Sequence, residues 1–147
     1  MKTCTFFGHR NCFAPDIDKK VENAIEKMIL HEGVTRFLVG DSGNFDAVVY
    51  RAIKKMKEKY PQIDYAVVIS YLRSKNDPTA PSPSETLFPD GIESVPKKFA
   101  ISYRGKWMVE KSDYVIAYVT HDYGGAAQFV RLAERKGKTV INLTKSD

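Results

Sequence analysis

Short apolar runs alternate with amphipathic stretches along almost the whole chain, and this alternation restricts the fold more than any other feature of the sequence. The apolar runs have the length and the β-branched and aromatic content of strands, and they cover 3–7, 34–39, 64–71, 113–119 and 139–143. In the stretches between them apolar residues recur at helical spacing, over 15–33, 44–60, 97–112 and 124–137. Strands that alternate with helices predict a parallel sheet, because right-handed crossovers leave few other solutions.

The predicted fold class is α/β, as a single three-layer, Rossmann-like domain over 1–147 with helices on both faces of the sheet. We expect five strands, mostly parallel, in the order 3-2-1-4-5. A chain of 147 residues is long enough to bury a sizeable core without a disulfide or a metal. Ligands of such sheets bind beyond the carboxyl ends of the strands, where the strand order reverses. In this chain that point lies between the first and fourth predicted strands.

One segment interrupts the alternation of strands and helices. The stretch 72–96 holds five prolines and has no apolar period. Connections of this length are uncommon in compact domains unless they are functional or disordered. We expect 73–95 to act as a mobile lid or a partner surface, because its sequence offers few backbone ladders and little apolar burial.

The charge of the chain favours an anionic partner but does not identify it. The net charge is +5, although the lysines of 51–60 lie between apolar positions, as on the solvated face of a helix. No apolar window reaches the ~20 residues of a membrane span, and the first residues do not form a targeting segment. We therefore expect a cytoplasmic protein without membrane contact.

The cysteines and histidines do not form a metal-binding pattern. Cys4 and Cys12 are too few for a disulfide scaffold, which fits a reducing compartment. His9 and Cys12 lack a second Cys or His pair nearby, and His31 and His121 are isolated, so the sequence predicts no metal site. The fingerprint G-x-G-x-x-G is absent after the first predicted strand, which argues against a standard dinucleotide site. We expect no cofactor.

Glycine-containing turns follow three of the predicted strands, all at the same edge of the sheet. Gly124 and Gly125 precede a helix, where free backbone N–H groups and the helix dipole favour an anion. An arginine at a strand end can bind phosphate through two hydrogen bonds, and an aspartate can accept from ribose hydroxyls. The candidate ligand-binding residues in these turns are Gly8, His9, Arg10, Gly40, Asp41, Ser42, Gly43, Asp46, His121, Gly124 and Gly125.

These turns also have purely structural explanations. A sharp turn requires glycine where φ is positive, even if no ligand binds. Ser42 or Asn44 can cap the following helix, and Arg10 can be an ordinary surface charge. Three such turns at one edge favour a ligand site more strongly than any one of them alone.

Four segments together resemble the SLOG superfamily: TFFGHR, VGDSGNFD, YRGKWMVEKSDYVIAYV and DYGGAA. This Rossmann-like group contains the Lonely-Guy-type phosphoribohydrolases and the DNA-processing protein A family. The resemblance covers nearly the whole chain and is closest to small bacterial members whose first strand ends in Gly-His-Arg. It implies a pocket for a nucleotide or a nucleotide-derived ligand.

The resemblance is incomplete at the residues that carry catalysis. Lonely-Guy enzymes use a helix motif with Glu-Arg-Lys and a later methionine, followed by a turn of the type P-G-G-x-G-T-x-E-E. Aligning the methionine with Met108 places the family arginine on Arg104, which joins the ligand-binding candidates, but it places the preceding glutamate on Tyr103. Aligning the two turns places the family glutamates on Ala127 and Gln128.

The sequence therefore favours binding over catalysis. Hydrolysis of an N-glycosidic bond needs a carboxylate, a role that Asp41, Asp46 or Asp122 would have to take. The leading hypothesis is a module that binds a nucleotide or nucleotide-derived signal, as a sensor or sequestering protein. Hydrolysis of nucleotide N-glycosidic bonds is the first alternative, and single-stranded DNA binding is the second.

The third predicted helix carries two further expectations. This helix carries more large apolar residues than one core-facing side needs, namely Tyr103, Trp107 and Met108. We therefore expect a homo-oligomer, a dimer paired through this helix. We expect Arg104 at the border of the apolar stripe, with its stem packed and its guanidinium free to reach the pocket.

Overall fold

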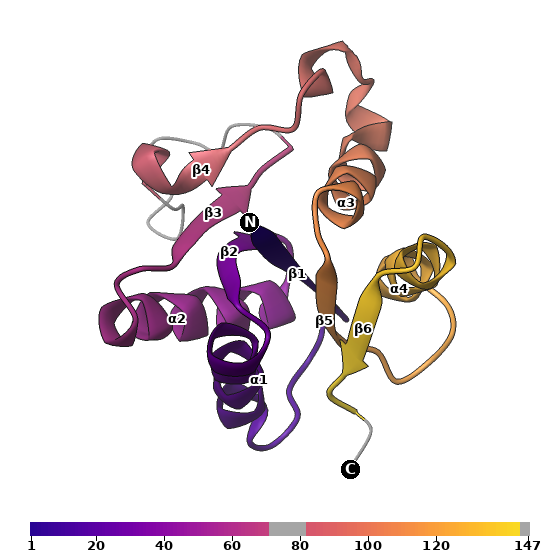
Figure 1. Cartoon of the computed structure of the whole chain (residues 1–147). Helices are drawn as coiled ribbons and strands as arrows, with labels where there is room; N and C mark the ends of the chain where they lie inside the picture. The colour runs from indigo at the N-terminus through magenta and orange to yellow at the C-terminus, as the bar shows by residue number, and fades with distance from the viewer. Residues whose placement is uncertain (71–81, 145–147) are drawn as a thin grey trace.

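The computed structural model describes residues 1–70 and 82–144, which form a parallel sheet between two layers of helices (Figure 1). Within these residues six strands lie in the order β4-β3-β2-β1-β5-β6, and every neighbouring pair is parallel. The strands are β1 (Lys2–Gly8), β2 (Val34–Val39), β3 (Asp64–Val68), β4 (Thr86–Leu87), β5 (Tyr114–Tyr118) and β6 (Thr139–Asn142). The helices are α1 (Ile17–His31), α2 (Asn44–Lys59), α3 (Ala100–Glu110) and α4 (Gly125–Arg135), with short 3-10 turns η1 (Pro83–Glu85), η2 (Ile92–Ser94) and η3 (Lys97–Phe99).

The predicted α/β class, with a parallel sheet and helices on both faces, is confirmed. The predicted number of five strands is wrong, because β4 adds a sixth strand beside β3. Val67 and Val68 of β3 lie opposite Thr86 and Leu87 of β4. A strand of two residues is too short to show alternating polarity, and this one lies in the proline-rich segment, so the sequence held no periodic signal for it.

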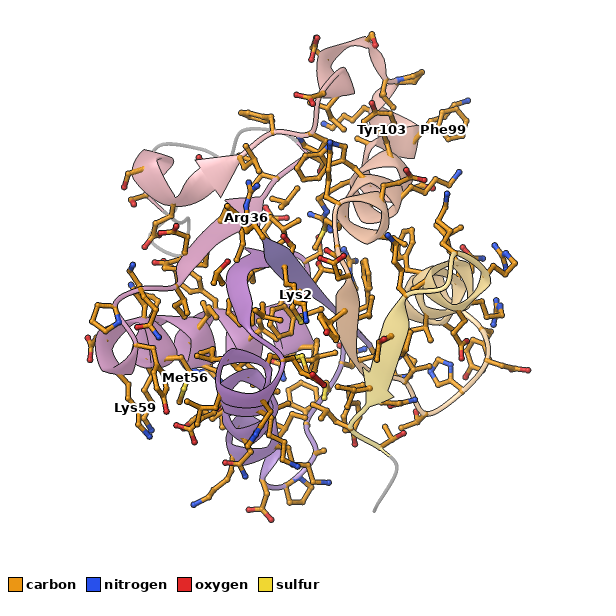
Figure 2. The ribbon with its side chains drawn as sticks, viewed as in Figure 1. Lys2, Arg36, Met56, Lys59, Phe99 and Tyr103 are labelled. Atoms are coloured by element: carbon orange, nitrogen blue, oxygen red, sulfur yellow. The ribbon has the colours of Figure 1, made fainter. Side chains whose placement is uncertain are left out.

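The predicted lid, 73–95, is described only from residue 82 onward, and 73–81 lie outside the described residues. The described part pairs with β3 through β4 and is also bonded to the domain through side chains. Glu85 accepts hydrogen bonds from the hydroxyls of Tyr50 on α2, at 2.6 Å, and Tyr65 on β3, at 2.7 Å. The hydroxyl of Tyr103 on α3, labelled in Figure 2, donates to the carbonyl of Asp90. A lid function for this segment stays a prediction.

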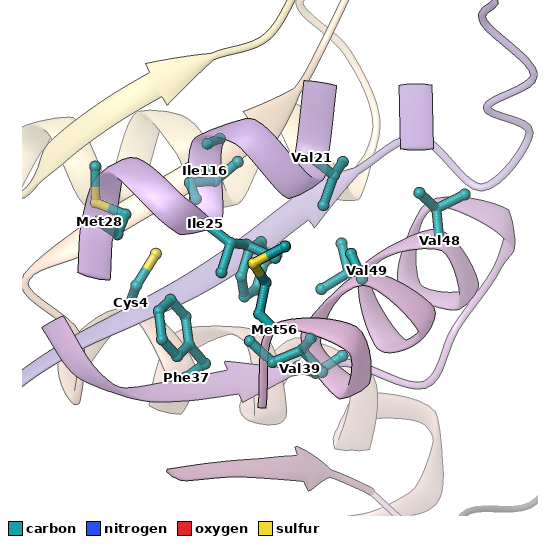
Figure 3. Packing of buried hydrophobic residues seen from close by; sticks show 14 of the residues in the cluster. Cys4, Val21, Ile25, Met28, Phe37, Val39, Val48, Val49, Met56 and Ile116 are labelled. Atoms are coloured by element: carbon teal, nitrogen blue, oxygen red, sulfur yellow. The ribbon is translucent and has the colours of Figure 1, made fainter. Parts of the chain in front are cut away.

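Helices α1 and α2 lie side by side on one face of the sheet (Figure 1). Their apolar stripes pack against the strands in one buried cluster, in which Ile25 of α1 and Met56 of α2 lie near Phe37 of β2 (Figure 3). β1 is buried at every position from Thr3 to Phe7, because helices cover both sides of this central strand. The carboxyl end of β1 is therefore held firmly in place.

Helices α3 and α4 cover the other face, and their close approach depends on a glycine. Gly105 of α3 is buried against the ring of Phe129 on α4, which also lies 5.0 Å from the ring of Phe7. A Cβ atom at position 105 would overlap the Phe129 ring. Any side chain there would push the two helices apart.

We expect Gly105→Ala to lower the free energy of unfolding by about 1–3 kcal/mol, as overpacking of a well-filled core does. Urea denaturation measures the change. Gly125→Ala is the matched control on α4, because a Cβ there would lie 3.9 Å from the same Phe129 ring, at ordinary contact distance. Equal stability of Gly105→Ala and the wild type would mean that the helices are not packed this closely in solution.

Candidate functional site

A pocket of about 660 Å³ opens at the carboxyl ends of the central strands. β1 lies between β2 and β5, so the strand order reverses at this point, as it does at the ligand sites of open α/β sheets. Ten of the predicted ligand-binding residues line the pocket: Gly8, His9, Arg10, Gly40, Ser42, Asp46, Arg104, His121, Gly124 and Gly125. Asp41 and Gly43 are not among the lining residues. A role of these residues in ligand binding stays a prediction.

The rest of the lining was not predicted from the sequence, and it consists of Phe6, Phe7, Asn11, Ile101, Met108, Thr120 and Ala126. Asn11, Thr120 and Ala126 are next in sequence to predicted ligand-binding residues, so their position in the turns could have predicted them. Ile101 and Met108 come from α3, and only the packing angle of that helix brings them to the pocket.

Two helices begin at the pocket, and the residue before each is a glycine in the same backbone conformation. Gly43 precedes α2 with φ 91° and ψ −177°, and Gly124 precedes α4 with φ 91° and ψ 173°. This region of backbone space is essentially restricted to glycine. The structural explanation therefore accounts for Gly43 and Gly124 without any ligand.

Gly125, the first residue of α4, differs from both because neither its backbone conformation nor its packing against the described residues requires a glycine. Its φ is not positive, and an added Cβ would meet no atom closer than Phe129 at 3.9 Å. Glycine has a lower helix propensity than alanine, so local helix propensity does not explain it either. Within the described residues, no acceptor binds the N–H groups of Gly125, Ala126 and Ala127. The missing side chain leaves open space before free N–H donors at the pocket edge.

Gly8 and Gly40 have packing reasons of their own. A Cβ at Gly8 would overlap the ring of Phe45 in the first turn of α2. A Cβ at Gly40 would lie 2.6 Å from a carboxylate oxygen of Asp46, in the same turn. These two glycines let α2 begin directly against the ends of β1 and β2, and so they bring Asp46 to the pocket.

Arg104 reaches the pocket from α3, but its guanidinium is already bound. Nη1 donates to Asp41, and Nη2 donates to the Ser42 hydroxyl at 3.0 Å. The residue is 6% exposed, and its Nε has no hydrogen-bond partner among the described residues. The expectation of a free guanidinium is therefore wrong, because the turn after β2 approaches α3 closely enough for Asp41 to pair with it. Arg104 holds this turn in place.

Asp46 is the carboxylate that lines the pocket. Its Oδ2 accepts a hydrogen bond from the Ser42 N–H at 2.9 Å. Burial raises the pKa of Asp46 to about 6, against the opposing effects of the Ser42 N–H and the positive charges of Arg104 and Arg10. A carboxyl with this pKa can give or take a proton close to neutral pH.

The raised pKa of Asp46 predicts that this residue destabilises the fold once it ionises. An aspartate carboxyl ordinarily has a pKa of 3.8, so the folded state holds the proton more tightly between that pH and about 6. The contribution of Asp46 to stability is thus highest below pH 4 and falls as pH rises through 6. From pH 4 to 7 we expect Asp46→Asn to gain roughly 2 kcal/mol over the wild type, at about 1.4 kcal/mol per pKa unit after allowing for solvent screening.

Urea denaturation of both proteins at intervals from pH 4 to 7 measures this difference. Other titrating groups are common to the two proteins, so their effects cancel in the comparison, and an asparagine oxygen can still accept from the Ser42 N–H. Parallel pH profiles for the two proteins would contradict a raised pKa at Asp46.

Two histidines stack at the mouth of the pocket. The rings of His9 and His121 lie 3.8 Å apart between centroids and 15° from parallel. His9 Nε2 accepts a hydrogen bond from the Thr120 N–H at 2.8 Å, so this nitrogen carries no proton. Burial and the neighbouring His121 both lower the pKa of His9. His9 is therefore neutral at pH 7, and Arg10 is the exposed cation of the pocket.

Among residues 1–70 and 82–144, no three His, Cys, Asp or Glu side chains are grouped in a way that would hold a metal ion. Cys4 and Cys12 are both buried and unpaired. No helix in the described part of the chain is long and apolar enough to cross a membrane.

Comparisons with known proteins support the fold. No protein-family model matches the chain, and no curated protein matches it. A solved structure that it resembles is DNA processing protein A from Streptococcus pneumoniae, with 18% sequence identity and a TM-score of 0.70. The match covers 95% of this chain and 49% of that one, so this chain spans about half of its length. At this identity the likeness shows the fold alone, a Rossmann-type fold that the SLOG resemblance also implies.

Proposed function

We propose that the pocket binds a nucleotide or a nucleotide-derived anion, as a sensor or sequestering module. The observation that carries this proposal is Gly125, whose missing side chain neither backbone conformation nor packing explains. Free N–H groups at a helix start, together with the helix dipole, favour a phosphate, and Arg10 adds an exposed positive charge at the same pocket. The space before α4 is accounted for if a phosphate occupies it.

Two further points support this kind of ligand. The pocket of about 660 Å³ is within the range of small-molecule sites. The protein of similar fold is named for processing DNA, which is built from nucleotides. Single-stranded DNA is the corresponding alternative, and it would show a steep loss of affinity with salt because several phosphates would be neutralised together.

A second candidate function, hydrolysis of a nucleotide N-glycosidic bond, is favoured by Asp46. The family glutamates align with Ala127, which is buried, and Gln128, so neither position supplies a carboxylate. Asp46 is a pocket carboxyl with a pKa of about 6, suitable for a general acid or base. Release of free base from nucleoside monophosphates, measured by chromatography, would favour this candidate, and loss of that release in Asp46→Asn would assign the role.

The proposal predicts that nucleotides raise the melting temperature. A ligand that binds only the folded state adds about 2.7 kcal/mol at a hundredfold excess over Kd. A panel of mono-, di- and cyclic nucleotides at millimolar concentration tests this in a thermal-shift assay, and mass spectrometry of small molecules that co-purify with the protein identifies the natural ligand. If the whole panel leaves the melting temperature unchanged, the pocket does not bind nucleotides.

We also propose that the chain self-associates through the start of α3. Trp107, Met108 and Tyr103 are buried or half-buried within the fold, so they do not supply a free surface. Phe99 and Ile101 are 53% and 42% exposed, and Phe99 lies at the outer end of α3 in Figure 2. Light scattering that shows only monomer at tens of micromolar would contradict this proposal.

A further inference from the structure

Three aromatic rings form a continuous stack that runs from the pocket to the solvent. The rings of His9 and His121, both pocket residues, are stacked at 3.8 Å. Tyr123 continues the stack, at 3.8 Å from His121 and 17° from parallel. Tyr123 is 68% exposed, and among the described residues no other ring or cation is recorded against it. One face of the Tyr123 ring is therefore covered by His121, and the other faces water.

Hydrogen bonds within the turn 120–123 and to His9 and Arg131 hold the residues that carry this stack. His121 Nδ1 lies 3.0 Å from the carbonyl of Tyr123, and since a carbonyl only accepts, Nδ1 carries the proton. The Thr120 N–H bonds to His9, and Arg131 Nη1 donates to the carbonyl of Asp122 at 2.6 Å. Every residue from 120 to 123 thus takes part in one of these contacts. The backbone of this turn is therefore held by hydrogen bonds, and the Tyr123 ring extends from it into solvent, stacked on His121.

The stack ends next to the pocket in the sequence: Tyr123 does not line the pocket itself, but His121 and Gly124 on either side of it do. Tyr123 immediately precedes Gly124 and Gly125, so the open face of the ring and the free N–H groups of α4 belong to one turn. Arg104 lines the same pocket, and its Nε is a buried donor without a partner among the described residues. The free N–H groups that can bind an anion and a ring that can support a planar group therefore belong to neighbouring residues of one turn.

We propose that Tyr123 is the platform on which the base of the bound nucleotide stacks. The ligand class is then a phosphate that carries a planar heteroaromatic ring, as opposed to a sugar phosphate without a base. This inference rests on the proposed nucleotide site and adds the group that recognises the base. Stacking tolerates any base because every base has a π face, so Tyr123 supplies affinity without selecting the sequence or the kind of base.

Calorimetric titration tests the proposal with AMP, GMP, CMP, UMP and ribose 5-phosphate as probes. We expect Tyr123→Ala to weaken binding of the nucleotides by roughly 5- to 150-fold, the range that loss of one stacked base gives. Binding of ribose 5-phosphate, which has no base, should change less than twofold. Tyr123→Phe keeps the ring and should retain affinity for the nucleotides, which separates stacking from a role of the hydroxyl.

The outcomes separate this inference from the function on which it rests. If the wild type binds neither nucleotides nor ribose 5-phosphate, the proposed function fails and the inference fails with it. If the nucleotides bind wild type and Tyr123→Ala equally well, or if ribose 5-phosphate loses as much affinity as they do, only the inference is overturned. A short single strand such as a thymidine hexanucleotide distinguishes the source of the base. A loss with mononucleotides supports a free nucleotide as the ligand, and a loss with the hexanucleotide alone overturns that inference in favour of a base within a strand.

Discussion

Replacement of Arg104 by alanine is expected to lower the free energy of unfolding by about 3–5 kcal/mol. The side chains of Arg104 and Asp41 are only 7% and 13% exposed, and they form an ion pair with a further hydrogen bond from Arg104 to Ser42. Removal of one partner from a buried ion pair has a cost of this size, because the remaining charge loses a close charged neighbour in a poorly solvated place. Chemical denaturation measures the effect.

Two control variants make the Arg104 experiment specific to the ion pair. Arg104→Lys keeps the charge but cannot reproduce the planar fork that reaches Asp41 and Ser42 together, so it should recover only part of the stability. The double variant Arg104→Met with Asp41→Asn removes both charges, and we expect it to be more stable than Arg104→Ala. A cost below about 1 kcal/mol for Arg104→Ala would show that the pair is exposed to water in solution.

The ion pair also changes how a binding defect at position 104 must be interpreted. Arg104 holds the turn that carries Asp41 and Ser42, and Ser42 in turn donates its N–H to Asp46 in the pocket. A weaker affinity in Arg104→Ala can therefore arise from a displaced turn. Binding of Arg104→Ala is therefore measured where the variant is fully folded, so that unfolding does not add to the effect of the displaced turn.

The layout of the fold could be predicted from the sequence because its elements are long and strongly periodic. Helix α2 is an example: all six apolar positions from Phe45 to Met56 that share its predicted face are buried. Strand β4 shows the limit of this reasoning. Its two residues join the sheet because they reach Val67 and Val68, a tertiary contact that leaves no trace in the local pattern.

The candidate site was predictable where it depends on strand ends and not where it depends on side-chain partners. Parallel strands bring their carboxyl ends to one edge, which is why the turns containing Gly8, Gly40 and Gly124 meet at one pocket. The pairing of Arg104 with Asp41 depends on how α3 packs over that edge. The stacking of Tyr123 on His121 likewise depends on the shape of one turn, which spacing alone does not specify.

Gly125→Asp is expected to abolish the binding of anions while leaving the fold intact. Position 125 is the first residue of α4, and an acidic side chain in the first turn of a helix is favourable by about 0.3–1 kcal/mol. The space around it is open, so the melting temperature should stay unchanged or rise. A carboxylate beside a bound phosphate, in contrast, opposes it by several kcal/mol, which corresponds to a loss of affinity of at least about 100-fold.

Substitutions of graded size and charge at position 125 identify the cause of that loss. Gly125→Ala fills part of the space and should weaken binding modestly. Gly125→Asn matches the aspartate in shape without its charge, so it should fall between the two, and the difference between Asn and Asp should shrink at high salt because ions screen the repulsion. Calorimetric titration of each variant with a nucleotide measures these affinities. If Gly125→Asp binds as tightly as the wild type, the ligand's negative charge does not lie at the start of α4, and the open space at Gly125 has another cause.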